Sequence, residues 1–97
     1  MSTYLILFRF TQQGIQNIKD SPARVQQAKV AFEAVGARVK QFYGLMGRYD
    51  TAFIAEAPDD ETIIKATATV AARGFVSTET LRAFTEEEFN KLISELP

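Results

Sequence analysis

The sequence predicts an α+β protein in which two helices cover one face of a four-stranded antiparallel sheet. Three observations predict this class: four short segments with apolar residues in alternation, two longer segments with apolar residues at helical spacing, and the order in which they follow one another. The 97 residues are the length of one domain, 1–97, and no Pro- or Gly-rich linker divides them.

The first predicted strand runs over Thr3–Phe10. Side chains alternate between the two faces of a strand, and one face carries four apolar or aromatic residues: Tyr4, Ile6, Phe8 and Phe10. Leu5 and Leu7 lie on the other face. Both faces are therefore apolar, and we expect both to be covered.

The first predicted helix follows a connection over Thr11–Ser21. Ser21 is the expected N-cap, Pro22 suits the first helical position, and the helix runs to about Val35. Spacings of three and four residues place four apolar side chains on one stripe: Val25, Ala28, Phe32 and Val35. Gly36 then ends the helix in the left-handed conformation.

The middle of the chain predicts an antiparallel hairpin. The expected strands are Arg38–Met46 and Asp50–Ala57, joined by Gly47-Arg48-Tyr49. Pro58 ends the second of them because proline cannot donate to a sheet ladder.

The second predicted helix opens on Asp59-Asp60-Glu61, whose charges complement the positive end of the helix dipole, and runs to about Arg73 before Gly74. Its inward residues are Ile63, Thr67, Val70 and Ala71. A fourth strand over Val76–Phe84 and a short terminal helix over Glu86–Leu96 complete the chain. That helix carries an apolar stripe: Phe89, Leu92, Ile93 and Leu96.

The order β-α-β-β-α-β predicts the ferredoxin-like arrangement, with both helices on one face of the sheet and the short helix added after it. The other face is left bare. We expect it to carry Ile6, Phe8, Phe10 and Phe42 or Tyr43, which is too apolar for contact with water. Sheet-to-sheet pairing of two copies, as a homodimer or a higher oligomer, is the simplest way to cover it.

Composition excludes several classes of function. The chain has no cysteine and no histidine, which removes disulfides, thiolate nucleophiles, imidazole bases and the commonest metal ligands. The net charge of −1 shows no basic excess for nucleic acid, and no segment is apolar enough to cross a membrane. We therefore expect a cytoplasmic protein with no metal, no cofactor, no nucleic-acid partner and no membrane.

Three segments resemble the GYD domain family: Gly47-Arg48-Tyr49-Asp50, Glu56-Ala57-Pro58-Asp59-Asp60 and the stretch 74–84. The resemblance covers essentially the whole chain. It implies a place in the dimeric α/β-barrel group, where two ferredoxin-like protomers pack sheet against sheet. That wider group includes cofactor-independent monooxygenases, isomerases, haem enzymes and ligand-binding domains, so the resemblance implies no one activity. Its haem members need an axial ligand, usually histidine, which this chain lacks.

The candidate ligand-binding residues are Arg48, Tyr49, Asp50, Glu56 and Arg82. For the first three, a turn in which Gly47 supplies positive φ and Asp50 caps the turn is the simpler interpretation. The alternative is a rim of Arg48 and Asp50 around a small anionic or polar ligand.

Glu56 lies among apolar neighbours late in its strand, with Arg82 and Arg9 as the available cations. A sheet-surface or dimer-spanning ion pair is favoured over a carboxylate base whose pKa burial has raised.

Two hypotheses about function follow, and a third concerns assembly. The first is a non-enzymatic oligomeric module that binds a small ligand or a protein. The second is a cofactor-independent enzyme of the monooxygenase or isomerase type, which requires a deep cavity holding Glu56 or Asp50. The third is a structural unit whose terminal helix is buried in the assembly.

Overall fold

The computed structural model describes all 97 residues. Its elements are β1 (Ser2–Phe10), α1 (Gln12–Gln16), a 3₁₀ turn (Ile18–Asp20), α2 (Ser21–Ala34), β2 (Arg38–Gly44), β3 (Thr51–Ala57), α3 (Asp60–Ala71), β4 (Val76–Ala83) and α4 (Glu86–Ser94). The predicted order is confirmed. The hairpin strands are shorter than predicted, because the chain leaves the ladder at Gly44 and rejoins it at Thr51. The terminal helix is also shorter than predicted and ends at Ser94.

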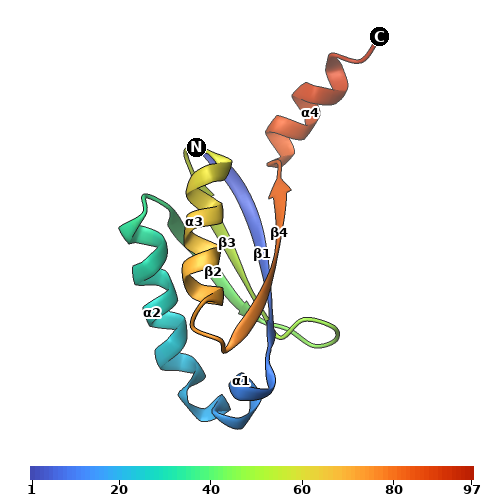
Figure 1. Ribbon diagram of the computed structural model, residues 1–97. Helices are drawn as coiled ribbons and strands as arrows, with labels where there is room; N and C mark the ends of the chain where they lie inside the picture. The colour runs from blue at the N-terminus through green and yellow to red at the C-terminus, as the bar shows by residue number, and fades with distance from the viewer.

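The four strands form one antiparallel sheet in the order β2-β3-β1-β4. This is the predicted ferredoxin-like α+β arrangement, in which β1 lies between β3 and β4, and β2 lies at the edge beside its hairpin partner β3. Figure 1 shows α2 and α3 side by side over one face of the sheet, with the opposite face free of helices.

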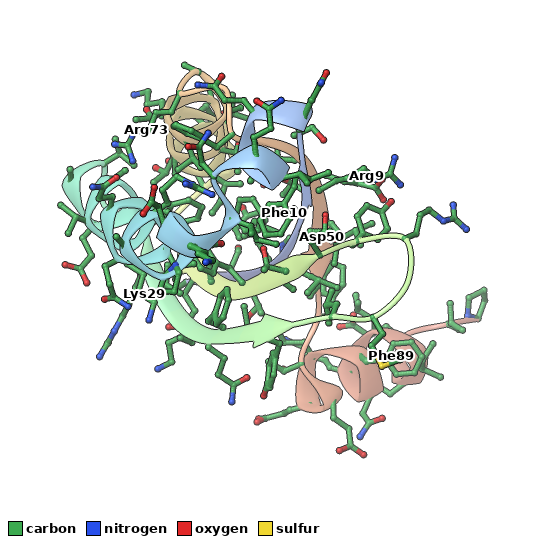
Figure 2. All side chains as sticks on the ribbon, turned by 90° about the horizontal axis from the view of Figure 1, so that it is seen from below. Arg9, Phe10, Lys29, Asp50, Arg73 and Phe89 are labelled. Carbon is green, nitrogen blue, oxygen red and sulfur yellow. The ribbon has the colours of Figure 1, made fainter.

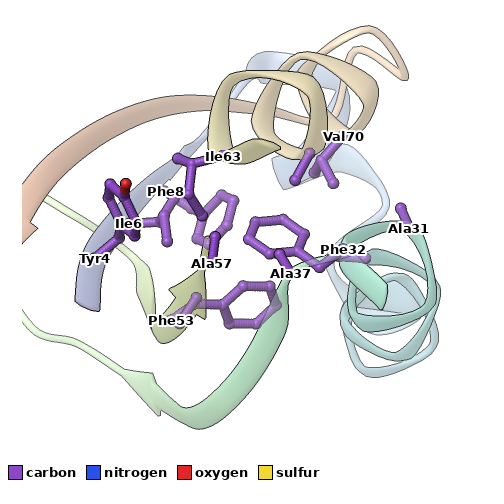
Figure 3. Packing of buried hydrophobic residues seen from close by; sticks show 13 residues of the cluster. Tyr4, Ile6, Phe8, Ala31, Phe32, Ala37, Phe53, Ala57, Ile63 and Val70 are labelled. Atoms are coloured by element: carbon purple, nitrogen blue, oxygen red, sulfur yellow. The ribbon is translucent and has the colours of Figure 1, made fainter. Parts of the chain in front are cut away.

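The core lies between that face and the two helices. Phe53 stands at its centre, where its ring meets the rings of Phe8 at 5.0 Å and Phe32 at 5.3 Å, both nearly edge to face (Figure 3). Such geometry is favourable for aromatic pairs. The predicted helix stripes face this core, and Ala28, Phe32 and Ile63 are buried in it.

The connection after β1 is more ordered than predicted, because it contains α1 and the 3₁₀ turn. Thr11 caps α1 by accepting from the Gly14 N–H, and its hydroxyl donates to the Gly74 carbonyl at 2.7 Å. A Cβ on Gly14 would stand 2.1 Å from the carbonyl oxygen of Phe75. Glycine is therefore required where α1 packs against the start of β4.

The N-caps of the two long helices differ in how well they were predicted. The N-cap of α2 is Asp20 and not Ser21, which is already helical, and Asp20 makes no side-chain capping bond. The N-cap of α3 is Asp59, whose Oδ1 accepts from the Thr62 N–H at 2.9 Å. The hydrogen bond from the Thr62 hydroxyl, followed by the one from the Thr62 N–H, holds the pKa of the Asp59 carboxyl below its usual range. Gly36 ends its helix with positive φ, as predicted, and Gly74, the predicted end of the other helix, also has positive φ.

The bare face of the sheet carries Tyr43, one of the two predicted alternatives, but not Ile6, Phe8 or Phe10. Ile6 and Phe8 point to the helices and are buried, and Phe42 packs against Phe53 on the same side. The open face instead carries five large side chains that are half-buried or exposed: Leu5, Leu7, Tyr43, Ile54 and Leu81. Both faces of β1 are apolar, so alternation alone does not say which one the helices cover.

The terminal helix α4 extends past the end of β4, away from the sheet and the other helices (Figure 1). Thr85 and Glu88 form a capping box at its start. Its apolar stripe packs on nothing in the same chain, and Phe89, Leu92, Ile93 and Leu96 are all exposed. None of the helices is long and apolar enough to span a membrane.

Candidate functional site

The loop that joins β2 to β3 lies at one end of the open face. Gly47 adopts a φ of 105°, as predicted, and the Leu45 N–H donates to the Asp50 carbonyl at 2.9 Å to close the loop. Met46 at its tip is fully exposed. The loop is therefore a protruding element, closed at its base by backbone hydrogen bonds.

Tyr49 links this loop to β1 and β4. Its hydroxyl donates to Glu79 Oε1 at 2.6 Å, and the Arg9 guanidinium lies 5.3 Å from the centre of its ring. Arg9 Nε also donates to the Arg48 carbonyl at 3.0 Å. The hydrogen bond to the Glu79 carboxylate raises the pKa of the Tyr49 phenol. The sequence alone did not point to Glu79, because its approach to Tyr49 depends on the register of β4.

A shallow polar hollow of about 240 Å³ lies beside this network, lined by Arg9, Arg48, Tyr49 and Glu79 among others. Two guanidinium groups and one carboxylate can bind a polar group of either charge. The hollow opens on the uncovered face of the sheet, so anything packed on that face also covers it.

Asp50 does not cap the turn, contrary to the prediction. Its Oδ2 accepts from the Phe10 N–H at 2.8 Å, and its own N–H donates to the Phe8 carbonyl at 2.8 Å. Both bonds hold the base of the loop against the end of β1 (Figure 2). The side chain is thus occupied in joining two strands.

Glu56 and Arg82 lie at the far end of the sheet from the loop. Glu56 lies on the open face, and its cation is Lys40 at 4.0 Å instead of Arg82 or Arg9. Arg82 is on the other face, opposite Tyr4, where its guanidinium lies 4.3 Å from the ring centre of Phe84. The structure therefore brings Arg48, Tyr49 and Asp50 together, but it separates Glu56 and Arg82 from them and from each other.

A second hollow lies between α2 and the sheet, and sequence reasoning missed it. Its lining is mainly apolar and includes Phe8, Phe10, Phe42, Phe53 and Phe75. Neither Glu56 nor Asp50 is part of it, so this cavity does not hold the carboxylate that the enzyme hypothesis requires. The only feature of the sequence that could have indicated this cavity is the number of phenylalanines, which is eight.

The remaining polar clusters have structural partners. Tyr4 donates to Asp60 Oδ1 at 2.5 Å, and Asp59 caps α3, so two of the three acids at the start of that helix are engaged. No group of three His, Cys, Asp or Glu side chains is arranged to hold a metal ion.

Comparison with known proteins gives the same family as the sequence motifs. The model of the GYD domain matches residues 4–93. A Thermus thermophilus protein named glutamine synthetase and cystathionine beta-lyase binding protein is 33% identical over 84 residues, which are 86% of this chain and 88% of that protein. The crystal structure of TTHA0845, also from Thermus thermophilus, is similar with a TM-score of 0.57 and 26% identity, covering 87% of this chain and 94% of that one. The chain therefore belongs to the GYD domain family.

Proposed function

We propose that this protein is a homo-oligomeric binding module, built as a sheet-to-sheet dimer, whose further partners are other proteins. The observation that carries the proposal is the open face of the sheet. Leu81 on β4 is 42% exposed and Tyr43 on β2 is 50% exposed, with Leu5, Leu7 and Ile54 between them. An apolar surface that runs across a whole sheet is typical of an interface.

The size and shape of the chain support a missing partner. It exposes 6456 Å², whereas a compact monomer of this mass exposes about 5,500 Å². The excess of roughly 900 Å² is close to the roughly 800 Å² that each partner buries in an interface of standard size. Its radius of gyration of 14.5 Å also exceeds the about 12.5 Å expected for this length.

The strand order gives α4 a place in such a dimer. When two of these sheets pack face to face about a two-fold axis parallel to the strands, β4 of one protomer lies over β2 of the other. Ala83 and Arg38 are at the same end of the sheet, because Ala83 pairs with Thr3, Thr3 pairs with Glu56, and Glu56 pairs with Arg38. α4 then lies beside the start of the partner's β2.

Charge supports the same placement. The segment from Thr85 onward has four glutamates and one lysine, while β2 and its loop have Arg38, Lys40 and Arg48 and no acid before Asp50. An acidic helix with an apolar stripe thus meets a basic edge strand, which is complementarity of the kind that orients partners.

The protein partners are proposed from the name of the Thermus relative, which describes binding to two enzymes. The test is direct titration of this protein with purified glutamine synthetase and cystathionine beta-lyase from its own organism, followed by light scattering. Saturable binding of either enzyme supports the proposal, and no binding of either at any accessible concentration contradicts the part that concerns protein partners.

The dimer is tested separately with Leu81→Glu, which places a charge among the apolar side chains of the open face, on the edge strand β4. We expect the wild-type protein to show dimer mass or a multiple of it by native mass spectrometry, and the variant to show monomer mass. Ile64→Glu is the matched control, because Ile64 is 65% exposed on the outer side of α3. A monomeric wild-type protein, or an unchanged mass for Leu81→Glu, contradicts sheet pairing.

No observation favours the cofactor-independent enzyme over this proposal. Its support was the set of Arg48, Tyr49, Asp50, Glu56 and Arg82, and these residues do not converge on one cavity.

A further inference from the structure

The cavity between α2 and the sheet combines an apolar interior with a cationic opening. It has a volume of about 60 Å³ and lies where β1 ends and α2 begins. A cavity needs a volume of about 10–15 Å³ to hold one water-sized group, so this cavity accepts roughly five such groups.

The interior is formed by aromatic rings from three strands and the start of β4. Phe8 and Phe53 are buried, while Phe10 and Phe75 are half-buried and close the end of the cavity. Aromatic walls present ring faces and edges to a second flat group at little cost in side-chain entropy. A planar apolar body is therefore the shape that this interior fits best.

The opening carries two arginines and no acid. Arg24 is held in place, because its guanidinium lies 4.4 Å from the ring centre of Phe75 and donates to the carbonyls of Asn17 at 3.0 Å and Gly14 at 3.4 Å. Arg73 follows the end of α3 and is exposed. It lies beyond Phe10 on the helix side of the molecule (Figure 2). No Asp or Glu is among the lining residues, so this positive charge has no counter-charge within the cavity.

We propose that this cavity binds a small carboxylate with a flat apolar body, of the class of monocyclic aromatic acids. The ring enters between the phenylalanines, and the carboxylate accepts hydrogen bonds from Arg73 and from the free N–H groups of Arg24 at the opening. This inference is independent of the proposed dimer and protein partners, because the cavity lies on the helix side of the sheet.

The test is titration of the full-length protein with benzoate, followed by amide chemical shifts in heteronuclear NMR spectra. We expect saturable shifts at the end of β1 and the start of α2 with a dissociation constant of about 1 mM, typical of so small a ligand. Benzylamine has the same ring with the opposite charge, and it should bind at least about tenfold more weakly. Equal affinities for the two compounds, or no saturable shifts with benzoate, overturn the proposal.

Two variants and one control distinguish the contribution of the charge from that of the cavity. Arg73→Gln should weaken benzoate binding about fivefold to tenfold, because a charge-assisted hydrogen bond becomes a neutral one. Lys65→Gln removes an exposed cation of α3 outside the cavity and should leave the affinity unchanged. Val25→Phe should fill the cavity and abolish the shifts, with the oligomer mass retained. Benzoate binding that survives both Arg73→Gln and Val25→Phe places the ligand elsewhere and contradicts the proposal.

Discussion

The two faces of the sheet have similar apolar content but very different surroundings. On the helix side, Ile6 and Phe53 are 0% and 1% exposed, in contact with α2 and α3. On the open side, Leu5, Leu7 and Ile54 are only half-buried, and only by their neighbours within the sheet. One layer of helices therefore covers only half of the hydrophobic surface of this sheet. In the proposed dimer, a second copy covers the other half.

The largest expected effect is a difference in stability between substitutions at two neighbouring residues that lie on opposite faces of the sheet. Phe53→Ala removes the ring that contacts Phe8, Phe32 and Phe42, and should lower the free energy of unfolding by about 3–5 kcal/mol. Ile54→Ala, one residue later on the open face, should cost about 1 kcal/mol when measured below the concentration of dimerisation. Urea unfolding followed by circular dichroism measures both.

The concentration dependence sharpens this test. Ile54→Ala should become more costly as protein concentration rises, because the side chain is then buried by the second copy. If Ile54→Ala costs as much as Phe53→Ala at every concentration, the open face is already packed within one chain, and the comparison fails.

A smaller effect is expected at α4, whose stripe extends the exposed apolar surface. Phe89→Asp should lower the assembly state, weakening self-association about tenfold or more, because a charge then enters the stripe that the proposed assembly buries. Sedimentation velocity over a concentration series measures this. Asn90→Asp is the matched control, since it adds the same charge outside the stripe. An unchanged mass for Phe89→Asp would mean that α4 contributes nothing to assembly.

The smallest effect concerns the polar edge of the buried face. Burial of Tyr4, followed by its hydrogen bond to Asp60, raises the pKa of this phenol above its usual value. The folded protein therefore holds the proton more tightly than the unfolded chain. The resulting stability is complete below about pH 10 and is lost as the pH rises through the raised pKa.

Tyr4→Phe tests this expectation. It should lower the free energy of unfolding at neutral pH by about 0.5–1.5 kcal/mol, through the lost hydrogen bond. It should also flatten the decline of stability above about pH 10. Tyr43→Phe, on the open face, should leave that decline in place. A decline that is equally steep in Tyr4→Phe would assign it to other groups.

The sequence predicted only those parts of the candidate site whose residues are close together along the chain. Gly47 indicated the loop, and Arg48, Tyr49 and Asp50 do lie together on it. The partners of these residues were not predictable, because Glu79 and Phe10 reach the loop through strand register. The same reason explains why Lys40 and not Arg82 is the cation beside Glu56.

The sequence by itself determined the order, type and approximate ends of the elements. Periods of two and of 3.6 residues, the stop signals Gly36 and Gly74, and Pro58 at the end of β3 act within a few residues, so they can be read without knowing the fold. Only the tertiary structure decided which apolar face of β1 the helices cover. It also decided that Gly14 must lie against Phe75, 61 residues later, and that five phenylalanines surround a cavity. These features depend on contacts between distant segments, and no local pattern encodes such contacts.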